Sequence, residues 1–269
     1  MRKLLVLCLL LLPTAAHSQD YGDGVTAHKN GQITKALSIW TKLAETGDVL
    51  SQASLGLAYF HLKTGDRKAN LKKAFKWLSK AAERGQKNAQ YNLGWMYAQG
   101  IHVRKGPRKA LDLYLKAAKQ GHTNAQNNVG TYYYNGWGTK RDYKTAFHWH
   151  KKAAEKGHAG AQNDVARHYY FGHGVKKDLN QSFQWNFRSA HRGNRHGQLS
   201  LGIHYAKGFG TPKHDLKAYM WVSVSVQNGG TKTARDILKS FQRQLSKERV
   251  RRGRAMAKKC LRSRYKHCG

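Results

Sequence analysis

Apolar and small residues recur along this chain three and four positions apart, with polar residues between them. In the stretch from residue 89 to 97, Ala89, Leu93 and Tyr97 are four positions apart, and amide residues such as Asn92 lie between them. Spacings of three and four bring side chains to one face of an α-helix. The pattern therefore predicts an amphipathic helix in this stretch.

The same stretch returns about every 36 residues, and a small residue marks each copy. The marking residues are Gly94, Gly130, Ala166 and Gly202, each 36 positions from the next, and Gly56 lies 38 positions before Gly94. A fixed period of this length indicates a solenoid, in which one helical unit is stacked on copies of itself. Solenoids are binding surfaces as a class, so the repeat alone leaves the function open.

A second helix follows the first in each repeat. The two are joined by glycine-containing loops such as Gly136-Trp137-Gly138, where glycine permits the left-handed backbone that ends a helix. The second helix carries small residues, such as Ala153 and Ala154, that allow close packing. It also carries a recurrent tryptophan that we expect to fill the space between layers. These tryptophans are Trp77, Trp149, Trp185 and Trp221.

Together these residues resemble the Sel-one-like repeat (SLR) family, which is related to the tetratricopeptide repeat. Residues 159–193 carry the family pattern as Ala161, Val165, Tyr169, Gly172, Gly174, Val175, Asp178, Ser182, Trp185, Ala190 and Gly193. The chain departs from it with Ala166 at a glycine position and Leu113 at the tryptophan position. The resemblance covers about residues 50–228. It implies an all-α fold, a right-handed α/α solenoid of stacked helix pairs, closed by a C-terminal helical cap.

The pattern divides the chain into four segments. We expect a signal peptide at residues 1–18, an N-terminal capping helix pair at 19–48, an array of about five SLR repeats at 49–228, and a basic C-terminal helical cap at 229–269. Caps are expected because a terminal repeat must not expose its apolar face.

The first eighteen residues have the composition of a secretory signal peptide. Arg2 and Lys3 precede a short apolar run, and the segment ends in small residues near Ser18. The apolar run is too short to span a bilayer, and no later segment is a candidate span. We therefore expect export, to the periplasm or alternatively to the cell exterior.

Export leaves two cysteines in the mature chain, Cys260 and Cys268, and we expect them to form a disulfide. His267 stands beside Cys268, but two thiols and one histidine without a fourth ligand do not indicate a zinc site. No metal and no cofactor are predicted.

The chain is strongly basic, with 49 Lys and Arg against 14 Asp and Glu and a formal net charge of +35. Such a charge favours anionic partners. The alternative is that the charge serves only solubility, and composition does not separate the two.

Two positions on the first helix of each repeat are candidates for a binding groove. In related solenoids this helix lines the concave face, so residues at one repeat position form a ladder. The groove residues predicted in this way are Asn92, Met96, Asn128, Tyr132, Asp164, His168, Ser200 and His204. Amide, aromatic and imidazole groups suit an extended peptide or glycan. The alternative is that these are ordinary polar positions without a ligand.

A second candidate is the basic C-terminal helix. The predicted anion-binding residues are Arg249, Arg251, Arg252, Arg254, Lys258 and Lys259. They would bind phosphate or sulfate groups with an affinity that falls as salt rises. The alternative is a solvated charged face on a capping helix. Aromatic residues are sparse there and no nucleic-acid-binding motif is present.

Enzymatic function is not predicted, and no catalytic residue is assigned. His148 and His150 are two positions apart and so point to different faces of a helix. A cysteine-rich branch of the SLR family has been linked to β-lactam binding and hydrolysis, but the cysteine pairs of that branch are absent from these repeats. A β-lactam-binding hydrolase is the remote alternative.

The combined prediction is a non-catalytic, exported scaffold of the SLR type that binds other proteins. A polyanion-binding protein, for acidic glycan, lipid headgroup or nucleic acid, is the alternative. Neither the protein partner nor the oligomeric state follows from the sequence.

Overall fold

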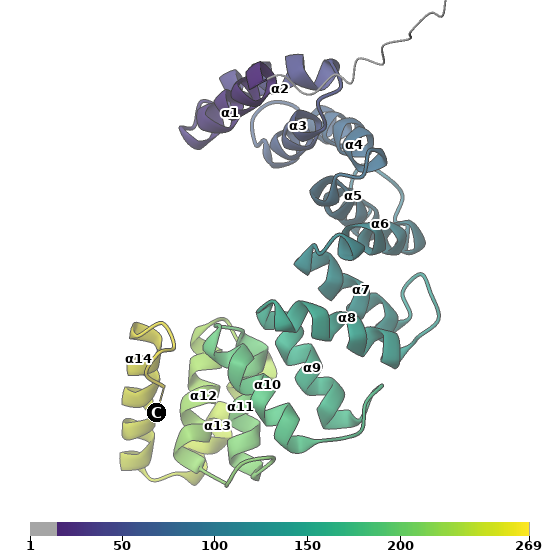
Figure 1. Cartoon of the computed structure of the whole chain (residues 1–269). Helices are drawn as coiled ribbons and strands as arrows, with labels where there is room; N and C mark the ends of the chain where they lie inside the picture. Colours follow the sequence, from purple (N-terminus) through teal and green to yellow (C-terminus); the bar gives the residue numbers. More distant parts are fainter. Residues whose placement is uncertain (1–14, 269) are drawn as a thin grey trace, which may run out of the picture. The chain divides into compact units, whose positions relative to one another are not determined.

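The structure is a computed structural model that describes residues 15–268 (Figure 1). Over these residues the chain forms fourteen α-helices and no strand, which confirms the all-α fold class. It divides into two compact units, one ending at Gly106 and the other beginning at Pro107, and each is described by itself. The predicted signal peptide lies outside the described residues as far as position 14, and the first helix begins at Ala15.

The first unit contains five helices, each packed on the next. They are α1 (Ala15–Lys29), α2 (Ile33–Glu45), α3 (Val49–His61), α4 (Arg67–Glu83) and α5 (Lys87–Gln99). Trp40 and Trp77 are buried in one core with Leu55. The helices α3 and α5, one repeat apart, also contact each other.

The second unit contains nine described helices. They are α6 (Pro107–Lys119), α7 (Thr123–Asn135), α8 (Tyr143–Glu155), α9 (Ala159–Phe171), α10 (Leu179–His191), α11 (Arg195–Lys207), α12 (Asp215–Gln227), α13 (Lys232–Gln244) and α14 (Lys247–Arg262). Consecutive helices pack as far as α13, and α9 contacts α11 across one repeat. We call the first helix of each repeat (α3, α5, α7, α9, α11) the A helix and the second (α4, α6, α8, α10, α12) the B helix.

The loops end the A helices as the sequence predicts. Gly100, Gly136, Gly172 and Gly208 follow the four A helices α5, α7, α9 and α11, with φ of 72°, 75°, 76° and 73°. Only glycine adopts this left-handed conformation without a steric cost. The B helices carry the predicted core tryptophans. Trp77, Trp185 and Trp221 are buried, and Trp149 is half-buried.

A buried glutamine joins each repeat to the helix before it. Its side-chain amide nitrogen donates to the backbone carbonyl of an alanine eight residues earlier, in the last turn of the preceding helix. The pairs are Gln52 with Ala44, Gln90 with Ala82, Gln126 with Ala118, Gln162 with Ala154, and Gln198 with Ala190, at 3.1–3.2 Å. Each of these carbonyls also accepts the backbone N–H of the glycine three residues later, so the glutamine adds a second bond that ties the A helix to the end of the preceding helix.

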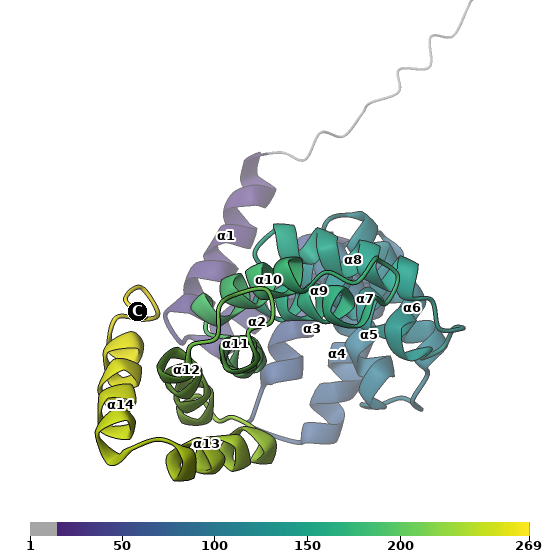
Figure 2. The same cartoon turned by 90° about the horizontal axis from the view of Figure 1, so that it is seen from below.

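The C-terminal segment covers the last repeat. In both views α14 lies beside α12 at the end of the array (Figures 1 and 2), and α12 contacts both α13 and α14. The predicted disulfide is confirmed, since Cys260 and Cys268 are bonded with an S–S distance of 2.00 Å. Tyr265, in the loop closed by the disulfide, bonds through its hydroxyl to Asn228 at 2.9 Å. Among the described residues no helix is both long enough and apolar enough to cross a membrane.

Candidate functional site

The predicted groove residues form two series, and the structure exposes only one of them. Asn92, Asn128, Asp164 and Ser200 are partly exposed. Met96, Tyr132, His168 and His204 are buried, with exposed fractions of 0%, 7%, 0% and 2%. The prediction that this second series lines an open surface is therefore wrong for Met96, Tyr132 and His168, and His204 is reached only from the pocket described below.

The second series lies instead between repeats, against the B helix of the preceding repeat. Nε2 of His168 is 3.1 Å from Nδ1 of His150, which is on α8. Nε2 of His204 is 3.1 Å from Oγ of Ser182, which is on α10. Successive residues on a helix are rotated by about 100°. A residue two positions after the landmark glycine or alanine therefore faces the interface between repeats, whereas the residue one position after the landmark faces solvent.

Burial changes the ionisation of these imidazoles. It lowers the pKa of His168 to about 4 and the pKa of His150 to about 3, because the charged ring loses its hydration. Burial also lowers the pKa of His204. The imidazoles are therefore neutral at pH 7 and serve as hydrogen-bonding core groups.

The residue directly after the landmark glycine or alanine is partly or fully exposed in α7, α9 and α11. We define the A-helix face by three partly or fully exposed positions on each of these helices: the residue directly after the landmark, the residue three positions before that one, and the residue four positions after it. These are Asn128, Thr131 and Asn135 on α7, Asp164, Arg167 and Phe171 on α9, and Ser200, Ile203 and Lys207 on α11. Phe171 is 55% exposed, which is unusual for a large apolar side chain. A spacing of three from the partly exposed series would have found Thr131, Arg167 and Ile203 from the sequence.

The A-helix face is hollowed between α9 and α11. This α9–α11 pocket has a volume of about 290 Å³ and lies above two residues of α10. It is lined by Ala166, Arg167, Tyr170 and Phe171 of α9, Ser182 and Asn186 of α10, and Ser200, Ile203 and His204 of α11. Two of the predicted groove residues, Ser200 and His204, are brought together here. The walls are mainly apolar and the floor is polar.

The polar groups of the floor are held by bonds within the protein. The imidazole of His204 contacts Ser182 through Nε2 and the carbonyl oxygen of Phe209 through Nδ1, at 2.6 Å. Asn163 donates from its amide nitrogen to Oδ1 of Asn186 at 2.8 Å, and to Oγ of Ser200 at 3.4 Å. The floor is therefore pre-formed by contacts among α9, α10 and α11.

Arg167 stands at the rim of the pocket with its side chain 47% exposed. One guanidinium nitrogen pairs with Oδ1 of Asp164 at 3.3 Å. The guanidinium carbon lies 5.0 Å from the ring centre of Tyr134, whose hydroxyl accepts a bond of 3.4 Å. These contacts orient a positive charge at the edge of an apolar hollow.

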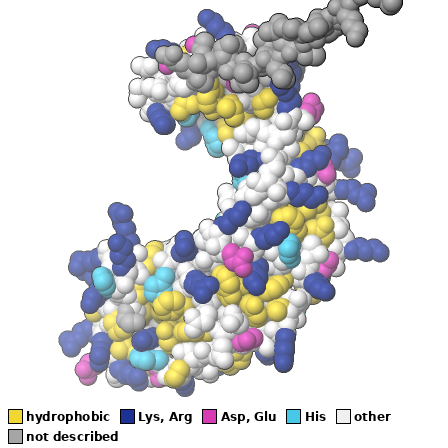
Figure 3. Space-filling view, viewed as in Figure 1, with side chains coloured by type: hydrophobic (Ala, Val, Ile, Leu, Met, Phe, Trp, Pro, Cys, Tyr) yellow, Lys and Arg dark blue, Asp and Glu magenta, His cyan; other side chains and the backbone are white. Residues whose placement is uncertain are grey.

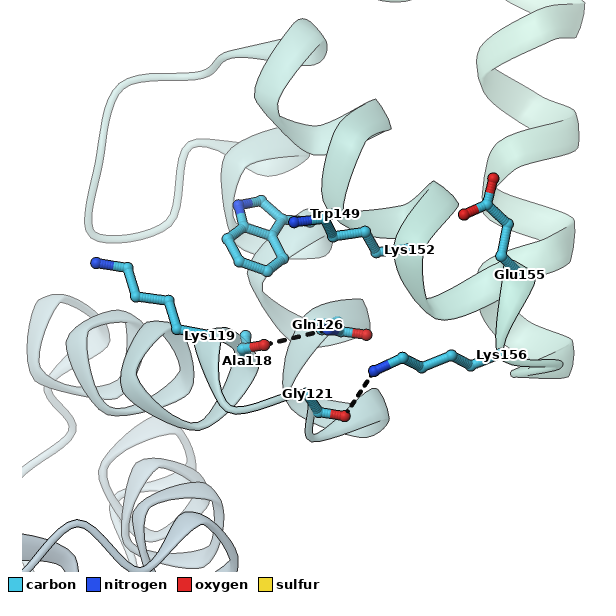
Figure 4. Close-up of a pocket in the computed structure, with 8 residues that line it drawn as sticks. All are labelled: Ala118, Lys119, Gly121, Gln126, Trp149, Lys152, Glu155 and Lys156. Carbon is cyan, nitrogen blue, oxygen red and sulfur yellow. Dashed lines mark hydrogen bonds between the residues drawn. The ribbon is translucent and has the colours of Figure 1, made fainter.

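A second, more open hollow of about 530 Å³ lies among α6, α7 and α8 (Figure 4). Its lining includes Lys119, Lys152 and Lys156, and the last two have structural contacts. Lys156 donates to the carbonyl oxygen of Gly121 at 2.9 Å, and Lys152 lies over the ring of Trp149 at 5.0 Å. Gln126 in this hollow makes the inter-repeat bond described above (Figure 4). We therefore assign the hollow to the joining of repeats.

The predicted anion-binding cluster lies on the solvent side of α14. Gly253, Ala257 and Cys260 are buried, while the six predicted cations are exposed. Two of the six have contacts on α12. Arg249 is 3.9 Å from Asp215, and Arg254 donates to the hydroxyl of Tyr219 at 3.3 Å. Elsewhere in this unit Lys and Arg are spread over the visible face without gathering in one patch (Figure 3).

This arrangement of helix pairs is that of a repeat scaffold, and the sequence match identifies its class. Five consecutive copies of the Sel1 repeat match residues 49–86, 87–122, 123–158, 159–194 and 195–229. Because these copies cover more than half of the chain, the chain belongs to the Sel1 repeat family. Proteins of this family bind protein partners and are generally not catalytic.

Solved structures support the same assignment. A Sel1 repeat protein from Oxalobacter formigenes is 31% identical, with a TM-score of 0.77 over 88% of this chain and 96% of that one. A protective antigen present in uropathogenic Escherichia coli strains, which displays an SLR fold, is 26% identical with a TM-score of 0.80. That match covers 86% of this chain and 50% of the antigen, so this chain spans half the antigen's length.

One curated relative is a plant protein. An F-box protein of Arabidopsis thaliana is 35% identical over 81 residues. The matched stretch is 30% of this chain and 22% of the plant protein, so the likeness is confined to a short part of each.

Proposed function

We propose that this protein is an exported, non-catalytic scaffold that holds a partner protein on the A-helix face of α7, α9 and α11. Membership of the Sel1 repeat family supports protein binding in general. The observation that points to this face is the apolar α9–α11 pocket with the exposed Phe171 beside it. Concave apolar sites with a few placed polar groups are where proteins usually bind ligands.

Export is supported by the composition of the first eighteen residues and by the disulfide between Cys260 and Cys268. Disulfides persist in oxidising compartments and are rare in the cytosol. The test is mass spectrometry of the protein from fractionated cells. A mature chain that begins near Gln19 in the periplasmic or external fraction is expected. A full-length chain in the cytosol would overturn the proposal of export.

Photo-crosslinking from the A-helix face tests the scaffold proposal. A photoreactive phenylalanine analogue replaces Asn135, which is exposed on α7 outside the pocket. The control places the same analogue at His148, which is exposed on the B helix α8. We expect a discrete crosslinked protein in envelope extract from position 135 and none from position 148. Equal products from both positions, or none from 135, would reject binding on this face.

A second candidate function is polyanion binding through α14, and the exposed side chains of its cation cluster favour it. Replacing Arg251, Arg252 and Lys258 with Gln removes three exposed charges without touching the buried side of the helix. Each lost phosphate or sulfate contact lowers the salt dependence of binding by about one unit of slope. We expect retention of the native protein on heparin to require more salt than retention of this variant. Identical elution would eliminate the cluster as a binding site.

A further inference from the structure

The α9–α11 pocket lies where three positions of the repeat differ from the copy before it. At the junction of α7 and α9 these positions hold His150, Asp164 and Arg167. At the junction of α9 and α11, 36 residues later in each case, they hold Asn186, Ser200 and Ile203. The second set has no aromatic ring, carboxylate or guanidinium.

At the earlier junction, between α7 and α9, the larger residues contact one another and their neighbours. The His150 ring lies within 3.4 Å of Thr131 Oγ1 and 3.8 Å of an Asp164 oxygen. The guanidinium of Arg167 covers the ring of Tyr134. One repeat later, Tyr170 stands where Tyr134 stood and Ile203 replaces the covering arginine, so the ring of Tyr170 becomes part of a pocket wall.

The pocket suits an apolar group. Its floor residues Ser182, Asn186 and His204 already have partners within the protein, so a ligand need not supply hydrogen bonds to them. Burying an apolar group against Tyr170 and Ile203 therefore leaves the bonds of Ser182, His204 and Asn186 Oδ1 unbroken. The volume of about 290 Å³ lies at or below the lower end of the range for drug-sized ligands, about 300–1,000 Å³. That is room for one large side chain.

The charge at the rim indicates what flanks this side chain. Arg167 is partly exposed, and its guanidinium has five N–H donors, of which the contacts to Asp164 and Tyr134 leave some for a further carboxylate. The chain as a whole carries a net charge of +35, which attracts acidic segments over a distance.

We propose that the α9–α11 pocket anchors one large apolar side chain, aliphatic or aromatic, of an acidic partner segment. This inference rests on the proposed scaffold function and names the chemistry that the A-helix face recognises. An anchor residue in a pocket carries a large share of the binding free energy at such interfaces.

The test uses a random peptide library displayed on phage, and two variants that introduce the same pair of charged residues at two places. The pocket variant is Ser200→Asp with Ile203→Arg, which copies the Asp164 and Arg167 pair of the preceding repeat. The control variant is Ser240→Asp with Gln244→Arg, which introduces Asp and Arg at exposed positions of α13, outside the A-helix face. Both leave the net charge unchanged, and thermal melts by circular dichroism establish that each is folded.

Peptides selected on the native protein are expected to contain a large apolar residue beside Asp or Glu. Their affinity should fall at least about tenfold in the pocket variant and stay within about twofold in the control. In methyl spectra, addition of a selected peptide should shift the signal of Ile203. Failure to select any peptide, selection of peptides without an apolar residue, or equal binding to both variants would overturn the inference. If only the pocket assignment is wrong, the crosslink from position 135 will still form. If the scaffold proposal is wrong, that crosslink will be absent as well.

Discussion

The landmark small residue of each repeat is required by the side chain that faces it on the B helix of the same repeat. A Cβ atom added at Gly202 would lie 2.6 Å from a methyl carbon of Val222, and one added at Gly56 would lie 2.7 Å from Cγ of Leu78. At Ala166 the facing residue is Asn186, one of the smaller residues that also open the pocket. The departure from glycine at this position is therefore accommodated locally.

The first prediction concerns this contact. Gly202→Ala should lower the free energy of unfolding by about 1–3 kcal/mol, because it overpacks the interface with Val222. Urea denaturation measures the effect. The control is Gly22→Ala in α1, where nothing lies within 4 Å of the added Cβ. There the higher helix propensity of alanine should be neutral or stabilising by up to about 1 kcal/mol. Equal effects at the two sites would show that packing against Val222 is not the reason for the glycine.

The second prediction concerns pH and the imidazole pair of His150 and His168. Burial lowers both pKa values, to about 3 and about 4, and the charges of Arg167 and His158 lower that of His150 further. In the unfolded chain both rings have the ordinary value of 6.5. Below that pH the unfolded chain binds protons that the folded chain does not, so stability falls as pH decreases.

Between about pH 7 and pH 5 the loss should be on the order of 2 kcal/mol for each ring. Burial raises the pKa of Asp164, so the folded state takes up a proton more readily there and offsets part of the loss at still lower pH. His150→Leu copies Leu78, the residue at the same repeat position in the first repeat, and should remove about 2 kcal/mol of this dependence, the contribution of its own ring. Urea titrations at the two pH values measure it. Parallel pH profiles for the native protein and the variant would contradict the assignment.

At the scale of the helix, the glutamine bond is the contact that recurs most regularly, and the helical pattern alone does not reveal it. Gln162 occupies a buried position among apolar residues of α9, where a polar side chain contradicts a simple amphipathic pattern. Its amide donates to the carbonyl oxygen of Ala154 at the end of α8, which also accepts the N–H of Gly157, so the glutamine ties α9 to α8.

The third prediction follows from this bond. Gln162→Met has a similar shape but cannot donate, so the bond between the repeats is lost while the carbonyl of Ala154 keeps the N–H of Gly157, and stability should fall by about 0.5–1.5 kcal/mol. Hydrogen exchange measures where the loss occurs, and faster exchange is expected at the end of α8 and the start of α9. A matched control is Gln120→Met, since Gln120 is exposed and bonds within its own helix to the carbonyl of Lys116. A uniform change across the unit, or a comparable loss in the control, would contradict a local role.

At the scale of the molecule, the array of the second unit is closed by α13 and α14, and the disulfide ties the chain end to α14. Cys260 and Cys268 lie in the same core cluster as Trp221 and Leu201. The loop between them contains Tyr265, which reaches Asn228 and lies against Gly193. The tail is thereby fixed to the last two repeats.

The fourth prediction is that Cys260→Ser with Cys268→Ser lowers the stability of the second unit by about 2–3 kcal/mol, as expected for the loss of a short closed loop. The variant should also release Tyr265, so that proteolysis removes the tail before the repeats are cut. Thermal melts and limited trypsin digestion under non-reducing conditions measure the two effects. An unchanged melting temperature together with an intact tail would show that packing alone holds the segment.

The sequence by itself determined the repeat length, the all-helical class, the glycine positions that end the A helices, and the disulfide. These follow from local rules: helical spacing, the left-handed preference of glycine, and the small number of cysteines. The predicted groove residues Asn128, Asp164 and Ser200 are partly exposed, and their role in binding stays a prediction. Tyr132 and His168 are buried, one position away from the partly exposed Thr131 and the exposed Arg167.

Only the tertiary structure decided which of two neighbouring positions on an A helix is exposed. A helix in the stack has one exposed face, and the neighbouring helices determine which residues lie on that face. The rotation of α9 depends on what α8 and α10 present to it, and no pattern within α9 encodes this. The pocket has the same origin. It is lined by residues of three helices, α9, α10 and α11, which meet only when the repeats are packed.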